Sequence, residues 1–316
     1  MQADRRRINA PAGGTAPPTF TFADHPDLLR RPTRTRKPDE HRKIFLRTGI
    51  VPSASGSAYY EVPPAKPAPS TGSLVPTSSS LKITCTVHGP RPLPRNAAFS
   101  PNLLLSTHVK FAPFATRQRR GYVRDASERD LGVHLETALR GVIIGDRWPK
   151  SGCEVVITVL EGEEDGWFGE GREKGGGWGM MSVLAECITV ASAALVDAGI
   201  DCVDLVSGGT AALVKGEGGE GEAVVLDPAP AEHEVTAACV VAYLQSRDEI
   251  TEMWMKGDAG DSTEGLMDQA VRAAVMSRTV LVEAVKEGLK VGGDVQPVNG
   301  APKGGEGKGK DVDMTG

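Results

Sequence analysis

The chain has 316 residues, of which 40% are apolar and 24% charged, and its formal net charge is −5. This length and composition can bury one substantial core or two joined halves, with polar tails left over. The apolar runs fall short of the ~18 residues that a membrane span needs, and no apolar stretch follows the charged N-terminus. We therefore expect a soluble protein that is neither secreted nor inserted in a membrane.

The distribution of charge is uneven along the chain. The net charge of −5 argues against a uniformly cationic surface for nonspecific nucleic-acid binding. Arginine and lysine nevertheless concentrate in the N-terminal half, at 30–37, 42–47 and 117–124, whereas glycine- and glutamate-rich stretches make the second half acidic. This pattern predicts one basic face on an acidic protein.

The cysteine and histidine patterns predict no metal centre. The cysteines are odd in number and far apart, and most lie in apolar runs, so we expect free buried thiols and a reducing compartment, cytosol or nucleus. No CxxC spacing and no i, i+4 histidine pair occurs, so we expect neither zinc nor another metal or cofactor. The five cysteines are Cys85, Cys153, Cys187, Cys202 and Cys239.

Composition divides the chain into a domain and two tails. Residues 1–41 and 295–316 are rich in proline, glycine and charge without apolar periodicity, which predicts a largely irregular N-terminal extension and a disordered C-terminal tail. Within the domain, 42–294, low-complexity stretches at 63–80, 162–179 and 215–222 predict surface loops. The glycine-rich stretch 162–179 is interpreted as an insertion between a first half, 42–161, and a second half, 180–294.

Short β-rich runs dominate the first half. They predict strands at 48–51, 57–62, 81–87, 102–111 and 154–160, which we expect to form one sheet. A stripe of leucines at 131, 135 and 139 then indicates an amphipathic helix laid on this sheet. Ser127, followed three residues later by Asp130, is interpreted as its N-terminal capping box.

The second half also predicts both strands and helices. It predicts a helix of small residues at 182–197, strands at 203–214, 223–226 and 235–244, and a long helix from about 262. We therefore expect an α+β protein in which two βα halves share one core.

A series of short segments resembles a known family, in the order in which that family has them. They include GPR at 89–91, AGI at 198–200 and LDP at 226–228, and the whole series covers 47–61, 85–91, 111–115, 127–131, 194–200 and 225–228. Together they resemble the RNase PH family of 3′-to-5′ exoribonucleases, whose members form the hexameric ring of exosomes. The resemblance implies the RNase PH-like fold, related to domain 2 of ribosomal protein S5.

The resemblance also implies which residues would carry phosphorolysis. Active members hold phosphate with an arginine, and the family spacing, counted back from the AGI turn, places Leu184 at that position. They also carry a pair of acids after the LDP strand. Here Asp227 matches the first acid, but His233 stands where the second is expected. At the start of the helix, Glu128 replaces the first of two arginines and only Arg129 remains. We therefore expect that phosphorolysis is lost and that there are no catalytic residues.

The leading hypothesis is a non-catalytic ring subunit of the exosome. The resemblance implies other RNase PH-like subunits as partners in a hetero-hexameric ring, one of them a side-by-side sister, with cap proteins of the S1/KH type, and single-stranded RNA in the channel. It implies residence in the nucleus, including the nucleolus, and in the cytoplasm. The expected RNA-binding residues are Arg95, Arg117, Arg119, Arg120, Arg124 and Arg129.

Two alternatives remain open. One is an active phosphate-dependent exoribonuclease in which Asp227, Glu232 and Glu234 supply the carboxylates and loop amides hold the phosphate. The other is a free RNA-binding adaptor that uses the arginines at 117–124.

Overall fold

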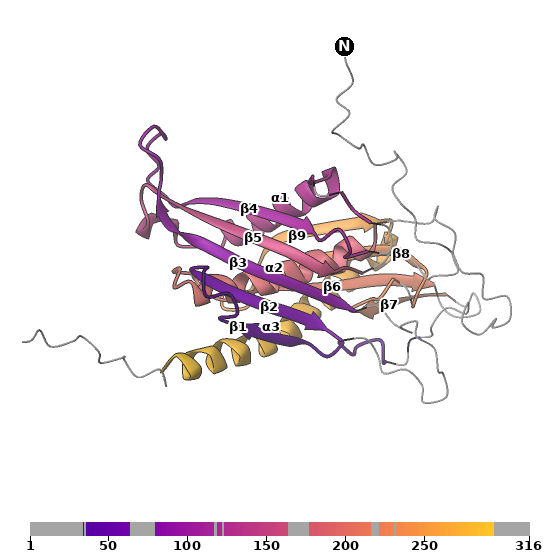
Figure 1. Ribbon diagram of the computed structural model, residues 1–316. Helices are drawn as coiled ribbons and strands as arrows, with labels where there is room; N and C mark the ends of the chain where they lie inside the picture. The colour runs from indigo at the N-terminus through magenta and orange to yellow at the C-terminus, as the bar shows by residue number, and fades with distance from the viewer. Residues whose placement is uncertain are drawn as a thin grey trace, which may run out of the picture.

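The computed structural model describes residues 34, 36–63, 80–116, 119–121, 123–163, 177–215, 221–230 and 232–293. Within them lie two β-sheets and three α-helices (Figure 1), so the predicted α+β class is confirmed. The predicted C-terminal tail, nearly all of the predicted N-terminal extension and most of the three predicted loops lie outside these residues. The domain boundaries therefore stay a prediction.

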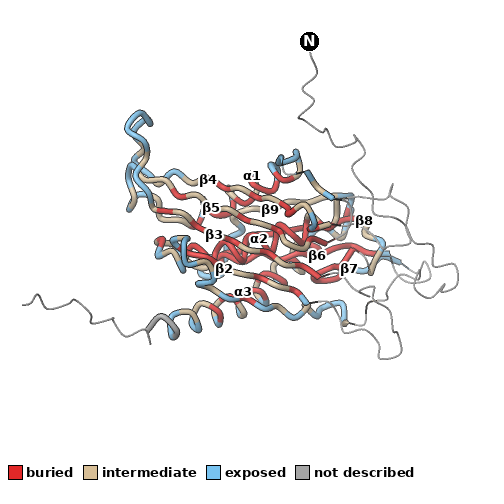
Figure 2. Tube along the Cα trace, in the orientation of Figure 1, coloured by how far each residue is buried: buried red, intermediate tan, exposed pale blue. Residues whose placement is uncertain are grey.

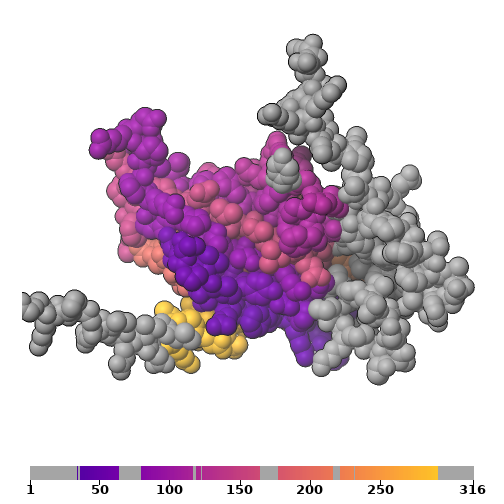
Figure 3. Space-filling view, viewed as in Figure 1, coloured from indigo at the N-terminus to yellow at the C-terminus, as the bar shows by residue number. Residues whose placement is uncertain are grey.

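The first sheet has the order β1-β2-β3-β5-β4, in which β4 is parallel to β5 and the other pairs are antiparallel. The predicted strand at 48–51 is wrong by about three residues, because Gly49, at φ +70°, begins the turn that follows β1. The outer face of this sheet carries no helix among the described elements (Figure 3). The strands are β1 (Phe45–Thr48), β2 (Gly56–Val62), β3 (Leu81–Pro92), β4 (Leu104–Phe111) and β5 (Ser151–Glu161).

The second sheet has the order β7-β6-β8-β9 and is antiparallel throughout. The prediction for β8 is confirmed to the residue, whereas β9 was missed. None of the nine residues of β9 is fully buried, and this edge strand therefore lacks the apolar alternation that marks a half-buried strand. The strands are β6 (Val206–Lys215), β7 (Glu222–Leu226), β8 (Val235–Leu244) and β9 (Glu249–Gly257).

Helix α2 (Gly179–Asp197) lies between the two sheets and is almost entirely buried (Figure 2). By length and composition it could cross a membrane, but its burial inside the fold is typical of a core helix. Helix α3 (Thr263–Gly293) covers the other face of the second sheet. Two adjacent glycines of β6 allow this layering: a Cβ on Gly208 would collide with the Ala185 backbone of α2, and one on Gly209 with the Ala270 backbone of α3.

Helix α1 (Ala126–Arg140) confirms the predicted amphipathic helix but not its predicted cap. The N-cap is Asp125, whose side chain accepts from the backbone of Glu128 at 2.8 Å, while Glu128 accepts from the backbone of Asp125 at 3.1 Å. The capping box thus begins two residues before Ser127, because Ser127 already belongs to the first helical turn. Glu128 is buried and also pairs with Lys110 of β4 at 2.9 Å.

All five cysteines are free thiols, as predicted, and all but Cys202 are buried.

Candidate functional site

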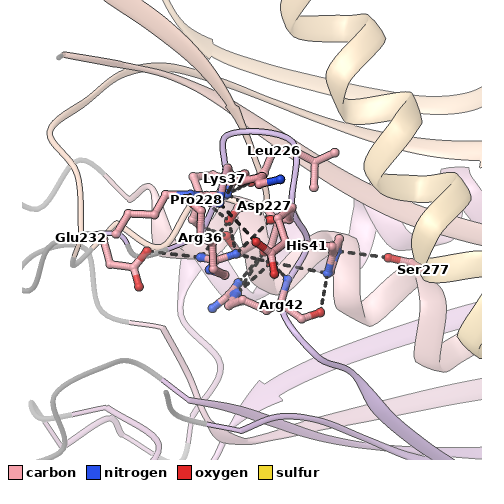
Figure 4. A network of polar contacts seen from close by, with 12 residues as sticks. Arg36, Lys37, His41, Arg42, Leu226, Asp227, Pro228, Glu232 and Ser277 are labelled. Carbon is pink, nitrogen blue, oxygen red and sulfur yellow. Dashed lines mark hydrogen bonds and ion pairs between the residues drawn. The ribbon is translucent and has the colours of Figure 1, made fainter. Parts of the chain in front are cut away.

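The LDP motif places Asp227 where the ends of the two sheets meet the segment that precedes β1 (Figure 4). Asp227 directly follows β7 and is 2% exposed, with a positive φ of 48°. Its backbone N–H donates to Thr210 of β6 at 2.9 Å, and the N–H of Leu226 donates to Pro38 at 2.8 Å. The second of these bonds therefore holds the segment around Pro38 against the end of the second sheet.

The Asp227 carboxylate accepts four hydrogen bonds from Arg42. Oδ1 accepts from Nη2 of Arg42 at 2.7 Å and from its Nε at 3.1 Å. Oδ2 accepts from the backbone N–H of Arg42 at 2.8 Å and from its Nε at 2.9 Å. A planar guanidinium matches a carboxylate in this two-pronged way, which makes the pair both strong and geometrically specific.

Arg42 also joins the first sheet to this site. Its Nη1 pairs with Glu163, which lies two residues after β5 and whose side chain is completely buried. Burial alone would lower the pKa of Arg42, but the carboxylates of Asp227 and Glu163 outweigh burial and raise it. Burial likewise acts to raise the pKa of Asp227, yet Arg42, followed by His41, holds that pKa well below its usual range. Both groups are therefore charged at neutral pH.

Two more arginines of the same segment complete the network. Arg36 reaches Oδ2 of Asp227 at 3.3 Å and Glu232 at 3.2 Å. Arg34 donates to the backbone carbonyls of Lys37, Glu40, Leu226 and Asp227 at 2.9–3.2 Å. Burial, and then the neighbouring charge of Arg36, lower the pKa of Arg34 to about 10. We call residues 34 and 36–42 the arginine arm.

His41 and Glu186 bring possible metal ligands close to Asp227. Nδ1 of His41 lies 3.4 Å from Oδ2 of Asp227, and ligand atoms of all three residues lie within 4.8 Å of one another. Burial, and then the charge of Asp227, raise the pKa of Glu186 to about 8. A divalent cation does not fit this set, because Asp227 already accepts from Arg42 and Arg36, and their guanidinium charges repel a second cation at the same oxygens.

The predicted anion-handling positions have different roles. Leu184 is fully buried inside α2, so helix and apolar core occupy the position at which the family spacing, counted back from the AGI turn, predicts the phosphate-holding arginine. His233 lies half-buried in the turn after Asp227. Of the carboxylates that the alternative enzyme would use, Glu232 pairs with Arg36 and Glu234 with Lys215 at 3.0 Å.

The predicted RNA-binding arginines divide into two groups. Arg119, Arg120, Arg124 and Arg129 lie between the end of β4 and the first turn of α1, whereas exposed Arg95 lies between β3 and β4, at the opposite end of the first sheet. Arg117 lies outside the described residues. Whether any of these arginines binds RNA stays a prediction.

Sequence reasoning missed most of this site, namely Arg34, Arg36, His41, Arg42, Glu163 and Glu186. The arm up to His41 was assigned to an irregular extension and Arg42 to the start of the domain, and their partner Asp227 lies 185 residues after Arg42. One signal was available: Glu186 is the only charged residue in the stretch 182–196, and a buried acid is normally paired or hydrogen-bonded.

Comparisons with known proteins agree with the fold and motifs. Residues 40–201 match the model of the 3′ exoribonuclease family, domain 1. The exosome complex component MTR3 of Chaetomium thermophilum is 52% identical over 90% of this chain and 98% of its own length. The Schizosaccharomyces pombe exosome complex component mtr3 is 30% identical over 90% of this chain and 96% of its own length.

A search of solved structures finds a crystal structure of rice Rrp46, which superimposes with a TM-score of 0.60 over 80% of this chain and 98% of that chain. Its sequence identity of 17% supports the fold alone. Motif order, architecture and the family match agree, and the chain belongs to the RNase PH family of 3′ exoribonucleases.

Proposed function

We propose that this protein is a non-catalytic ring subunit of an exosome, which holds partner subunits and guides RNA without cleaving it. The names of its relatives support the exosome assignment, since two of them, aligned over 90% of this chain, are exosome components. The absence of catalysis is supported by the site itself.

The observation that carries this proposal is the saturation of Asp227 by the arginine arm. Phosphorolysis needs donors that hold inorganic phosphate and a carboxylate that can accept a proton or bind a metal. Asp227 meets neither requirement for a carboxylate, because Arg42 and Arg36 occupy its oxygens and keep it from accepting a proton at neutral pH. At the matching phosphate position, Leu184 offers no donor.

Exposed apolar side chains on an unprotected strand support a role in assembly. Strand β9 forms one edge of the second sheet, where Ile250 and Met253 are 39% and 48% exposed. Among the described residues no element pairs with its free edge, and such an edge is a template for another chain. We propose RNase PH-like sister subunits in a hexameric ring, S1/KH-type caps and single-stranded RNA as partners, in nucleus and cytoplasm.

Two measurements test this proposal. The tagged chain is purified from its source, and the mass and composition of the recovered assembly are determined. We expect several RNase PH-like subunits together with cap proteins. Recovery as a free monomer would contradict the ring assignment. It would favour a free RNA-binding adaptor, for which the exposed Arg119, Arg124 and Arg129 supply cations for RNA phosphates.

Release of nucleoside diphosphates from single-stranded RNA is then measured with and without inorganic phosphate. We expect the assembly containing Asp227→Asn to match both wild type and the control variant Glu136→Gln, which changes an acid of α1 outside the candidate site, with thermal unfolding confirming that each is folded. A phosphate-dependent release that disappears only in Asp227→Asn would contradict the loss of catalysis.

A further inference from the structure

We propose that Phe114 is a base-stacking residue for single-stranded RNA, flanked by the phosphate-binding guanidinium groups of Arg119, Arg124 and Arg129. This inference rests on the proposed RNA-guiding function and adds an aromatic contact to it. Phe114 is 75% exposed, the most exposed of the large hydrophobic side chains among the described residues. Such exposure of a phenyl ring is unfavourable in water, and aromatic rings are the surfaces on which unpaired bases stack.

The turn that presents Phe114 is held in place on both sides. Ala112 donates to Val159 of β5 at 2.8 Å, Ala115 donates to Ala112 at 2.9 Å, and Gly162 donates to Ala115 at 2.9 Å. Ala112 and Ala115 are both buried. The backbone is therefore anchored to the first sheet on either side of the ring, so that stacking a base costs little ordering of the chain.

The charges around this turn are sorted into internal and outward-facing groups. Lys110 pairs with Glu128 and donates to the carbonyls of Gly121 and Val123 at 2.9 and 3.2 Å. Arg120 lies over the ring of Phe111, 4.1 Å from its centre, and pairs with Asp125 at 3.3 Å. These two cations thus neutralise two of the nearby carboxylates and organise the loop.

Three other cations of the same region are exposed. Arg119, Arg124 and Arg129 all lie at the surface, with Asp130 as an exposed acid beside them. Arg129 donates to the backbone carbonyl of Arg124 at 3.3 Å, which joins the start of α1 to the loop. An exposed ring with guanidinium groups in the same short segment matches the alternation of base and phosphate along a single strand.

The position of the turn agrees with this assignment. Gly162, which bonds to the turn, precedes Glu163, the partner of Arg42. Phe114 is therefore presented from a turn adjoining the site in which the arginine arm occupies the catalytic position. RNA guided past Asp227 and the arginine arm would therefore meet the phenyl ring of Phe114.

The test uses the intact assembly and a fluorescent single-stranded oligoadenylate, alongside the same oligomer with abasic sugars. Phe114→Leu keeps an apolar side chain but removes the aromatic face, whereas Phe114→Trp keeps a stacking surface. The matched control is Phe99→Leu, because Phe99 is 70% exposed at the opposite end of the first sheet. Assembly mass is measured for each variant.

We expect Phe114→Leu to weaken oligoadenylate binding roughly ten-fold, with Phe114→Trp and Phe99→Leu close to wild type. The effect of Phe114→Leu should vanish on the abasic oligomer, and this variant should leave the salt dependence of RNA binding unchanged. Replacing the three arginines by glutamine should instead flatten the salt dependence on both oligomers.

Other outcomes separate this inference from the proposed function. Weakened binding in the arginine variants with none in Phe114→Leu would refute stacking and leave RNA guidance intact. Unchanged binding in both sets would refute RNA contact at this loop altogether. If the Phe114→Leu assembly lost a subunit but kept its RNA affinity, the phenyl ring of Phe114 would be a contact for a protein partner. That result would overturn the inference.

Discussion

Replacing Arg42 by methionine tests the arginine arm directly. Methionine keeps much of the apolar stem but removes the guanidinium, so the carboxylates of Asp227 and Glu163 lose their principal partner. Removing one member of a buried ion pair typically costs about 3–5 kcal/mol, because the remaining charge is left without compensation. Arg36 and His41 still contact Asp227, so we expect the lower part of that range.

The expected loss is measured by urea unfolding at neutral pH, with thermal unfolding as a second probe. For a domain of this size, about 3 kcal/mol corresponds to a fall in Tm of roughly 6–12 °C. The control is Arg140→Met, which removes an exposed i, i+4 pair with Glu136 and should change stability by less than about 0.5 kcal/mol.

Acid should reduce the difference between the Arg42→Met variant and wild type. The folded-state pKa of Asp227 lies below its ordinary value of 3.8, so the stability that it contributes is present above that value and is lost as the pH falls further. The two proteins should therefore begin to converge as the pH falls below about 4, and should converge further as the pH approaches the folded-state pKa of Asp227. A variant that unfolds within 1 kcal/mol of wild type at neutral pH would refute the reasoning, since the arm would then contribute little to the fold.

Two further predictions concern the core. Glu186 has a folded pKa of about 8, raised from 4.5, so its burial should destabilise the fold increasingly as the pH rises from 4.5 to 8. Glu186→Gln should therefore raise Tm at pH 8 and have little effect near pH 4.5, and a gain independent of pH would contradict this cause. Gly208→Ala should cost more than about 3 kcal/mol, because its Cβ would lie 1.9 Å from the Ala185 carbonyl oxygen, whereas Gly265→Ala in the open first turn of α3 should be neutral or stabilising in urea unfolding.

Features with a local cause could be predicted from the sequence. Nearly continuous runs of apolar and small residues located β8 to the residue and α2 to within three residues, because almost all side chains of these two elements are buried. The order of short motifs identified the family, and the resemblance, through the family spacing, predicts Leu184 at the position where an active relative carries arginine. These inferences depend only on neighbours along the chain.

Tertiary structure decided the rest. Strand β9 has no fully buried residue and is recognisable only through its hydrogen bonds to β8. The capping residue of α1 is Asp125 and not Ser127, and Glu128 of this capping box is also buried against Lys110 of β4. The pairing of β9 and the contact of Glu128 both depend on other elements of the fold.

The arginine arm is the clearest example of this division. In the sequence, residues 34–42 form a charged, proline-containing run with no periodicity, which predicts an exposed segment. In the fold, Arg42 meets a buried carboxylate from each sheet, Asp227 and Glu163. The sequence by itself determined that an acid follows the LDP-type strand at Asp227, whereas only long-range packing decided that arginines surround it, because the partners of a charge are set by the path of the whole chain.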